Sequence, residues 1–193
     1  MRTVTILALL IGCITAANAD ARDDIALEIR LSTNHIRLAE PITITGVVKN
    51  ISKNKITVYR LPPIYCSTSI TLFDPSGRPL KDFKLSVFEL KPITRSDFVS
   101  LEPTDSISLE FEAVLKDDKI LGIESRDQKY QGLFLEFSDE DSAILIPKPG
   151  SYTIRFNYEF ERMFADEWSR QLGLKNLWSG RAISPPATIR ITR

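Results

Sequence analysis

Apolar and polar residues alternate along several short stretches of this chain, and that alternation limits the fold more than any other feature. In the clearest stretch, Tyr152, Ile154, Phe156 and Tyr158 are separated by single polar residues. Similar patterns cover residues 25–31, 42–49 and 106–114. Successive side chains of a β-strand point to opposite faces, so a period of two is typical of strands that bury one face. The chain is therefore expected to form an antiparallel β-protein.

The stretch from Leu38 to Leu61 is predicted to form the central hairpin of the fold. Two strand patterns, 42–50 and 56–59, flank a polar segment rich in Asn, Ser and Lys, which is typical of a turn. Pro41 opens the first strand, where a missing N–H costs little. Pro62-Pro63 closes the hairpin, because consecutive prolines cannot continue a strand ladder.

Turn sequences divide the rest of the chain into further short strands. Asp74-Pro75-Ser76-Gly77 is a type I turn sequence, with Pro in the second position and Gly in the fourth. Residues 79–97 are expected to form a long connection that covers the edge of a sheet. Residues 116–148 are expected to hold one extra strand and an apolar lip, Ala143 to Ile146. About eight strands with one short helix near the C-terminus predict an all-β fold, an antiparallel immunoglobulin-like β-sandwich.

The first 19 residues are predicted to be a signal peptide. Arg2 supplies positive charge, Val4 to Ile14 is an apolar run, and Ala17-Asn18-Ala19 fits a small-x-small cleavage site. A bilayer-spanning helix needs about 20 apolar residues, and no segment of the sequence reaches that length. Residues 20–193 are expected to form a single domain, exported to the periplasm or the extracellular space.

A lipid anchor is the alternative to simple cleavage. Leu10-Ile11-Gly12-Cys13 matches the bacterial lipobox, in which the cysteine is lipidated and becomes the mature N-terminus. Only residues 4–10 precede that motif as an apolar region, which is the lower limit for a signal peptide. Because this apolar region is so short, cleavage after Ala19 is favoured over lipidation. Membrane attachment is expected only if Cys13 is lipidated. Both interpretations export the protein.

The charge balance argues against nucleic acid as a partner. Without residues 1–19 the chain has 24 basic and 25 acidic residues, a net charge of −1 that gives no general attraction to nucleic acid or anionic lipid. Once Cys13 is cleaved or lipidated, Cys66 stands alone and no intramolecular disulfide is expected. A buried, inert Cys66 thiol is favoured over a reactive one.

Motifs for catalysis, metal binding and cofactor binding are missing from the sequence. His35 is the single histidine, and nothing orients a Cys66–His35 dyad. Asp139-Glu140-Asp141 does not match a calcium loop, so a solvated acidic turn is favoured. Asn50-Ile51-Ser52 is formally a glycosylation sequence, but a turn asparagine at the end of a strand explains it. No cofactor or metal is expected, and the chain is predicted not to be an enzyme.

Several short motifs follow one another in a fixed order along residues 25–192. They are Glu40-Pro41-Ile42, Leu72-Phe73-Asp74-Pro75-Ser76-Gly77, Leu101-Glu102-Pro103, Gly150-Ser151-Tyr152-Thr153-Ile154 and Trp178-Ser179-Gly180. The series resembles bacterial exported immunoglobulin-like domains related to the intracellular proteinase inhibitor family, and is similar to the propeptides of deuterolysin-type metalloproteases. The resemblance implies an immunoglobulin-like sandwich and an inhibitory or folding-assistant role. Where that family's turn is usually Pro-Gly, this chain has Pro103-Thr104.

Large aromatic residues gather between positions 160 and 180. Phe164, Trp168 and Leu172 recur at helical spacing, and Trp178 follows them. Aromatic residues concentrate in binding hot spots and are also good core residues. The spacing favours a buried helical stripe that caps one end of the sandwich. A partner-binding surface formed by Phe164, Trp168 and Trp178 is the alternative.

The leading hypothesis is a non-enzymatic, exported protein-binding or accessory domain. Its partner is expected to be another exported protein, bound through the long segments 79–97 and 116–148 or through residues 160–180. A second hypothesis is a proteinase inhibitor, with a rigid loop braced by Pro62-Pro63 or Lys91-Pro92. A third hypothesis is a carboxylate-based hydrolase such as a glycosidase, which needs two carboxylates about 5–9 Å apart in a cleft.

Overall fold

The computed structural model describes residues 24–60, 66–84, 92–121, 129–138 and 142–193. Within these ranges strands dominate, with one α-helix and one short 3₁₀ helix, Arg95–Asp97, so the predicted all-β class with a single helix near the C-terminus is confirmed. The strands are β1 (Ile25–Leu31), β2 (His35–Ile36), β3 (Pro41–Asn50), β4 (Ile56–Tyr59), β5 (Cys66–Phe73), β6 (Asp82–Lys84), β7 (Phe98–Leu101), β8 (Ser106–Leu121), β9 (Lys129–Phe137), β10 (Ser142–Ile146), β11 (Gly150–Phe160), β12 (Gly180–Ile183) and β13 (Ala187–Ile191).

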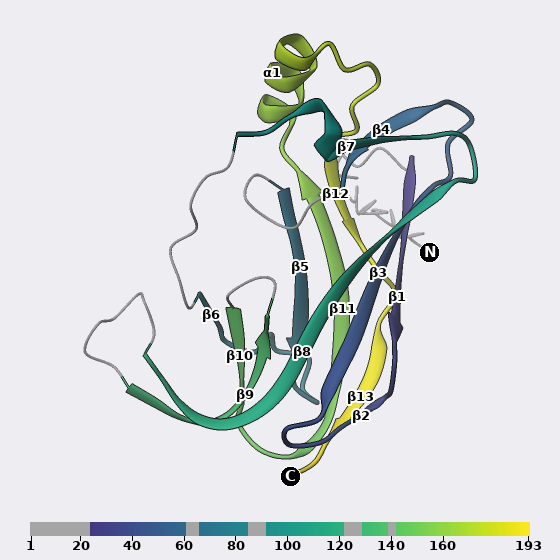
Figure 1. Ribbon diagram of the computed structural model, residues 1–193. Coiled ribbons are helices and arrows are strands. Elements are labelled where there is room, and N and C mark those ends of the chain that lie inside the picture. The colour runs from purple at the N-terminus through teal and green to yellow at the C-terminus, as the bar shows by residue number, and fades with distance from the viewer. Residues whose placement is uncertain (1–23, 61–65, 85–91, 122–128, 139–141) are drawn as a thin grey trace, which may run out of the picture.

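The larger sheet, sheet A, has the strand order β1-β3-β8-β9-β10-β6 and is antiparallel throughout. Its centre is the pairing of β3 with β8, which runs from Pro41 opposite Val114 to Lys49 opposite Ser106. The long β8 bends along its length and carries β9 and β10 round with it (Figure 1). Sheet A is therefore curled like a half-barrel rather than flat.

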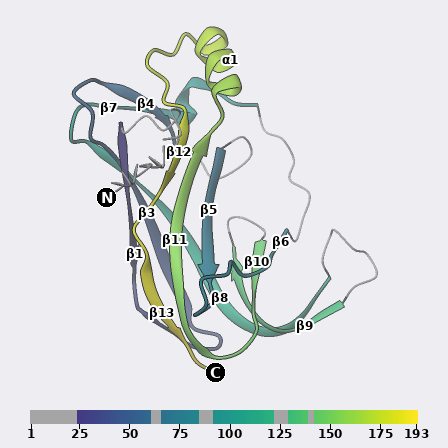
Figure 2. The same cartoon turned by 180° about the vertical axis from the view of Figure 1, so that it is seen from behind.

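The smaller sheet, sheet B, is organised around β11. One edge of β11 pairs with β5, and the other edge pairs first with β13 and then with β12. Figure 2 shows β11 running the length of the molecule between β5 and the β12–β13 side. The short β2 joins β13 in parallel, the one departure from antiparallel pairing among the described strands.

The core lies between the two sheets and follows the alternation in the sequence. Every second residue of β11, from Tyr152 to Phe160, is buried, and the residues between them are partly exposed. Ile42, Ile44 and Val48 of β3 are buried on the predicted core face of sheet A. Gly46 occupies the same row because the Phe156 ring fills the space beside it: a Cβ at Gly46 would lie 2.7 Å from two ring carbons.

The predicted hairpin between 42–50 and 56–59 is wrong, although both strands exist. β3 pairs with β1 and β8, whereas β4 pairs with β7 in a separate two-stranded sheet. All four residues of β4 are buried, so this strand needs neighbours that an edge position beside β3 would not supply. β4 lies instead between β7 and residues 176–178, where the Thr57 N–H donates to the Asn176 carbonyl at 2.8 Å.

The two long segments, residues 79–97 and 116–148, add strands to sheet A. In the first, β6 pairs with β10, and the Leu80 N–H donates to the Leu72 carbonyl of β5 at 2.8 Å. The Leu145 N–H of β10 donates to the Lys81 carbonyl at 3.0 Å, so residues 79–81 join the margins of the two sheets. The described part of the expected connection thus contains a short strand, β6, that forms the edge of sheet A itself. The second segment, residues 116–148, holds two new strands, β9 and β10, rather than one. The largely apolar stretches 133–137 and 142–146 pair with each other.

Helix α1 (Arg162–Leu172) closes one end of the molecule (Figure 1). The helix ends at Gly173, whose backbone is left-handed with a φ of 63°, a conformation that glycine adopts without steric cost. The buried face of the helix carries Ala165 and Trp168. Below it, the Tyr158 hydroxyl donates to the Tyr59 carbonyl and accepts the Tyr59 N–H, both at 2.9 Å, which ties β11 to β4.

Candidate protein-binding surface

The aromatic residues singled out in the sequence pack inside the molecule. Trp168 is 7% exposed and Trp178 is buried, while Phe164 is half-buried and stacks on Trp168 with ring centres 5.8 Å apart. These positions fit the favoured prediction of a buried stripe under a cap. Partner binding through the two indole rings would require an exposure that neither ring has in this structure. The surface of this end is formed by other residues.

Several other residues of interest lie outside the described ranges. They are the signal segment 1–19 with Cys13, the prolines at 62 and 63, Lys91, and Asp139-Glu140-Asp141. Cys66 begins β5 opposite Phe160, and His35 pairs with Arg190, which in turn lies opposite Ser151. Cys66 and His35 therefore sit near opposite ends of β11, about 30 Å apart at the ordinary rise per strand residue. The structure excludes a Cys66–His35 dyad.

Asn50 is a structural residue at the end of β3. Its side chain is fully buried and donates to the Leu101 carbonyl at 3.0 Å and to the Asn54 carbonyl at 2.8 Å. Its Oδ1 accepts the Ser52 N–H at 2.9 Å. The amide nitrogen that a glycan would need is thus engaged within the protein. The interpretation of Asn50 as a turn residue is confirmed, and the same side chain links two turns that are distant in the sequence.

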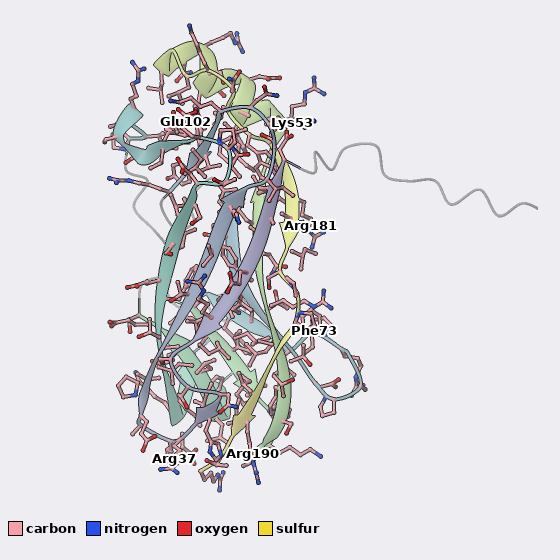
Figure 3. The ribbon with its side chains drawn as sticks, turned by 90° about the vertical axis from the view of Figure 1, so that its right-hand side faces the viewer. Arg37, Lys53, Phe73, Glu102, Arg181 and Arg190 are labelled. Atoms are coloured by element: carbon pink, nitrogen blue, oxygen red, sulfur yellow. The ribbon has the colours of Figure 1, made fainter. Side chains whose placement is uncertain are left out.

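Three turns meet at the end of the molecule that carries α1. We call residues 51–55, 102–105 and 173–179 the turn cluster. The first two turns are joined by Asn50 and by an ion pair between Lys55 and Glu102 at 2.5 Å. In addition, the Thr104 N–H donates to the Asn50 carbonyl at 3.0 Å. Figure 3 shows Lys53 and Glu102 at this same end of the molecule.

The third turn is fastened to the first by Thr57 and Asn176. The Thr57 hydroxyl donates to the Lys175 carbonyl at 2.8 Å, and the Trp178 N–H donates to the Thr57 carbonyl at 2.8 Å. The Asn176 amide donates to the Lys55 carbonyl at 3.1 Å. Because side chains and backbone both cross between the turns, the turn cluster forms one braced surface.

The turn cluster exposes an apolar residue and contains two backbone conformations that side chains rarely adopt. Ile51 follows Asn50 directly and is 50% exposed. Thr104 has a φ of 76° and Asn176 a φ of 54°, both in the left-handed region. Such conformations cost free energy for any residue with a Cβ, most of all for β-branched threonine. Residues that persist in them often belong to functional surfaces, although strain alone assigns no function.

Replacing Thr104 with glycine is expected to stabilise the protein by about 1 kcal/mol. Glu102 to Asp105 form a turn closed by the Asp105 N–H donating to the Glu102 carbonyl at 3.0 Å, with Thr104 at the position where a type II turn favours glycine. Urea denaturation of Thr104→Gly and Thr104→Ala measures the effect. The alanine variant keeps its Cβ and should gain little. A glycine variant less stable than wild type would show that Thr104 is not strained.

Asp74 accepts four hydrogen bonds from residues of its own turn. It accepts the Ser76 hydroxyl at 2.6 Å, the Ser76 N–H at 2.8 Å and the Arg78 N–H at 3.0 Å, and the Arg78 guanidinium adds a further bond. These donors, led by the Ser76 hydroxyl, hold the pKa of Asp74 well below its usual range. The Gly77 N–H donates to the Asp74 carbonyl at 2.9 Å, which confirms the turn expected at 74–77.

The pKa of Asp74 predicts that this turn loses stability in acid. A carboxyl whose pKa is lower in the folded state stabilises the protein above the unfolded-state pKa of about 4, and that contribution disappears as the pH falls below it. The free energy of unfolding of wild type should therefore fall more steeply between about pH 5 and pH 2 than that of Asp74→Asn. Asp166→Asn, on the exposed face of α1, is the control and should keep the wild-type slope. Equal slopes for wild type and Asp74→Asn would contradict this assignment.

Two of the described carboxylates, Glu28 and Asp74, have a pKa shifted in the direction opposite to that of a glycosidase's general acid. Such an acid requires a raised pKa. At Glu28 the pKa is instead lowered by the hydrogen bond from Arg30, and at Asp74 by the donors named above. Glu110 and Glu112 stand exposed on the outer face of β8. In the described part of the chain, no three His, Cys, Asp or Glu residues gather as a metal site would require, and no helix is long and apolar enough to cross a membrane.

No family model matches this chain, and no curated protein matches it. Among solved structures, a mutant β-glucosidase from Listeria innocua in complex with laminaribiose is similar over 88% of this chain and 16% of its own, with 14% identity and a TM-score of 0.34. The β-glucosidase in complex with isofagomine and with glucose gives 15% identity and a TM-score of 0.34 over 86% of this chain. The chain spans 16% of the length of these enzymes. At this TM-score the similarity carries no argument about the activity of the chain.

Proposed function

We propose that this protein is an exported, non-enzymatic protein-binding domain whose partner, another exported protein, binds the turn cluster. The observation that supports the proposal best is the bracing of three turns from distant parts of the chain around exposed Ile51. Loops on a rigid scaffold commonly carry binding residues. Export rests on the signal sequence expected in residues 1–19.

Bracing matters because binding costs conformational entropy. A loop that is ordered only on binding loses part of its interaction free energy, whereas a preorganised surface does not. The turn cluster is held by contacts to Asn50 and Thr57, two buried residues that are themselves fixed in strands. Ile51 can therefore be presented in one orientation. That geometry suits insertion of an apolar side chain into a pocket of the partner.

Capture from an envelope extract tests the proposal with matched variants. Leu38, which is 38% exposed, lies in a turn held by β8 at the end of the molecule away from α1, so Leu38→Glu is the control for Ile51→Glu. We expect wild type and Leu38→Glu to retain the same partner, and Ile51→Glu to lose it while its thermal unfolding is unchanged. If the two variants retained the partner equally, the assignment of partner binding to the turn cluster would be refuted. Failure of wild type to retain any specific protein, together with measurable turnover of a substrate, would refute the binding function.

A proteinase inhibitor is a special case of the same proposal. Inhibitors present a rigid, exposed loop to the enzyme, and the bracing of the turn cluster supports such a loop at Ile51. Wild type and the two glutamate variants can be assayed against serine, cysteine and metalloproteases. Inhibition that Ile51→Glu abolishes and Leu38→Glu retains would identify the partner as a proteinase. Absence of inhibition at micromolar concentration would exclude the inhibitor while leaving the binding proposal in place.

A further inference from the structure

The outer face of sheet B carries three arginines in a row. Arg190 lies opposite Ser151, and Arg181 lies opposite Glu159. Arg155 is on β11 itself, midway between these two positions. Successive arginines are therefore four residues apart along β11, about 13 Å at the ordinary strand rise. We call Arg155, Arg181 and Arg190 the arginine row; Figure 3 shows Arg181, Phe73 and Arg190 spread along the length of the molecule.

The two outer faces differ in their balance of charge. On the described part of the sheet B face, the carboxylate among these arginines is Glu159, which lies 3.7 Å from Arg181. On the described outer face of sheet A, carboxylates and cations balance: Glu28, Glu110, Glu112 and Glu136 against Arg30, Lys49, Lys81 and Lys116. A chain with almost no net charge thus presents a basic face on sheet B.

The surface between the arginines is uncharged and ordered. The Asn157 amide donates to the Thr71 hydroxyl at 2.8 Å, which joins β11 to β5 across this face. The Arg155 guanidinium lies 6.0 Å from the centre of the Phe73 ring. Ile183, opposite Asn157 and therefore between Arg155 and Arg181, is 45% exposed and adds an apolar side chain to the row. Arginines beside exposed apolar side chains are typical of protein interfaces.

We propose that the outer face of sheet B is a second interaction surface, and that it binds a protein with a carboxylate-rich surface. Arginine pairs with carboxylates through two parallel hydrogen bonds, so the row selects for negative charge. A row of about 26 Å suits the width of a protein interface of ordinary size. A lipid surface would favour a broad apolar band, whereas the described part of this face exposes one large aliphatic side chain, Ile183.

Fluorescently labelled poly-L-glutamate is the probe, and its anisotropy reports binding. The test variant carries Arg155→Gln, Arg181→Gln and Arg190→Gln. The control carries Arg30→Gln, Lys49→Gln and Lys116→Gln, which remove the same charge from sheet A. We expect wild type to bind the probe at low salt and to release it in about 0.5 M salt. The test variant should bind at least about tenfold more weakly, and the control nearly as tightly as wild type.

Three results would overturn the proposal. They are no binding by wild type at low salt, equal weakening in the test and control variants, and binding to phosphatidylglycerol vesicles in place of poly-L-glutamate. Thermal unfolding of both variants must match wild type, and an Arg→Lys version of the row should keep part of the binding. Because Ile51→Glu leaves this face intact, it should bind the probe normally. The result for the arginine row is therefore independent of the result for the turn cluster.

Discussion

Trp168→Ala is expected to lower the free energy of unfolding by about 3–5 kcal/mol, the range observed when a large buried aromatic is truncated. The Trp168 ring is the centre of the packing beneath α1. Four aromatic rings have their centres between 5.5 and 6.1 Å from it: Phe160, Phe164, Phe98 and Tyr59. Removing the indole leaves a cavity between the helix, β4, β7 and β11, and those rings lose both their contacts and part of their burial.

Met163→Ala is the matched control for Trp168→Ala. Met163 belongs to the same helix but is 65% exposed, so its truncation should change stability by less than about 0.5 kcal/mol. Urea denaturation followed by tryptophan fluorescence is unsuitable for a tryptophan variant, and far-ultraviolet circular dichroism replaces it. If Trp168→Ala remained within about 1 kcal/mol of wild type, the packed cap would be contradicted and a binding role for this side chain would regain support.

Gly46→Ala is expected to destabilise the protein by about 2–3 kcal/mol, although it adds one methyl group. The added Cβ would lie 2.7 Å from the Phe156 ring, a separation that real Cβ atoms essentially never show. Phe156 is fully buried, and its ring centre lies 5.9 Å from that of Phe111, so the ring has little room to move. At this point the backbone of β3 in sheet A lies directly against the Phe156 ring of sheet B.

Gly132→Ala separates that clash from the general effect of replacing a strand glycine. A Cβ at Gly132 of β9 would meet Leu145 at 3.5 Å, an ordinary contact, so this variant should be neutral or slightly stabilised. Adding Phe156→Leu to Gly46→Ala should recover part of the lost stability, and a double-mutant cycle measures that coupling. Additive effects of the two substitutions, or equal effects of Gly46→Ala and Gly132→Ala, would contradict the close approach.

The local structure of the strands could be predicted from the sequence because it depends on neighbouring residues. The alternation from Tyr152 to Tyr158 identified β11 and its buried face correctly. The pattern from Ile42 to Val48 did the same for β3. Helical spacing at Phe164, Trp168 and Leu172 located α1. In each case the periodicity of the apolar residues fixes which face is buried, whatever the partner strand is.

The choice of partner strands could not be predicted because it is decided far away in the sequence. The turn after Asn50 looked like a hairpin turn, yet its asparagine side chain bonds to Leu101, so β4 joins β7 instead of β3. Likewise, β8 continues to Leu121 and pairs with β9 over its second half. Nothing in residues 106–114 alone indicates that extension.

The turn cluster was missed in the sequence for a similar reason. Its three turns lie about 50 and 70 residues apart and become neighbours through contacts that include those of Asn50, Thr57 and Asn176. One local signal did exist. Pro103-Thr104 occupies the two central positions of the turn 102–105, where a type II turn favours glycine after proline, and Thr104 is left-handed in the structure. A threonine at a glycine position marks a place where backbone strain is retained.

Hydrogen–deuterium exchange of the protein, alone and with the partner captured from envelope extract, tests the central claim most directly. The proposal predicts slower exchange of amides in residues 51–55, 102–105 and 173–179 when the partner is bound. Residues 37–40, in the turn that carries Leu38 away from α1, should exchange at an unchanged rate. Protection confined to residues 37–40, or no change anywhere in the turn cluster, would contradict the assignment of this surface to protein binding.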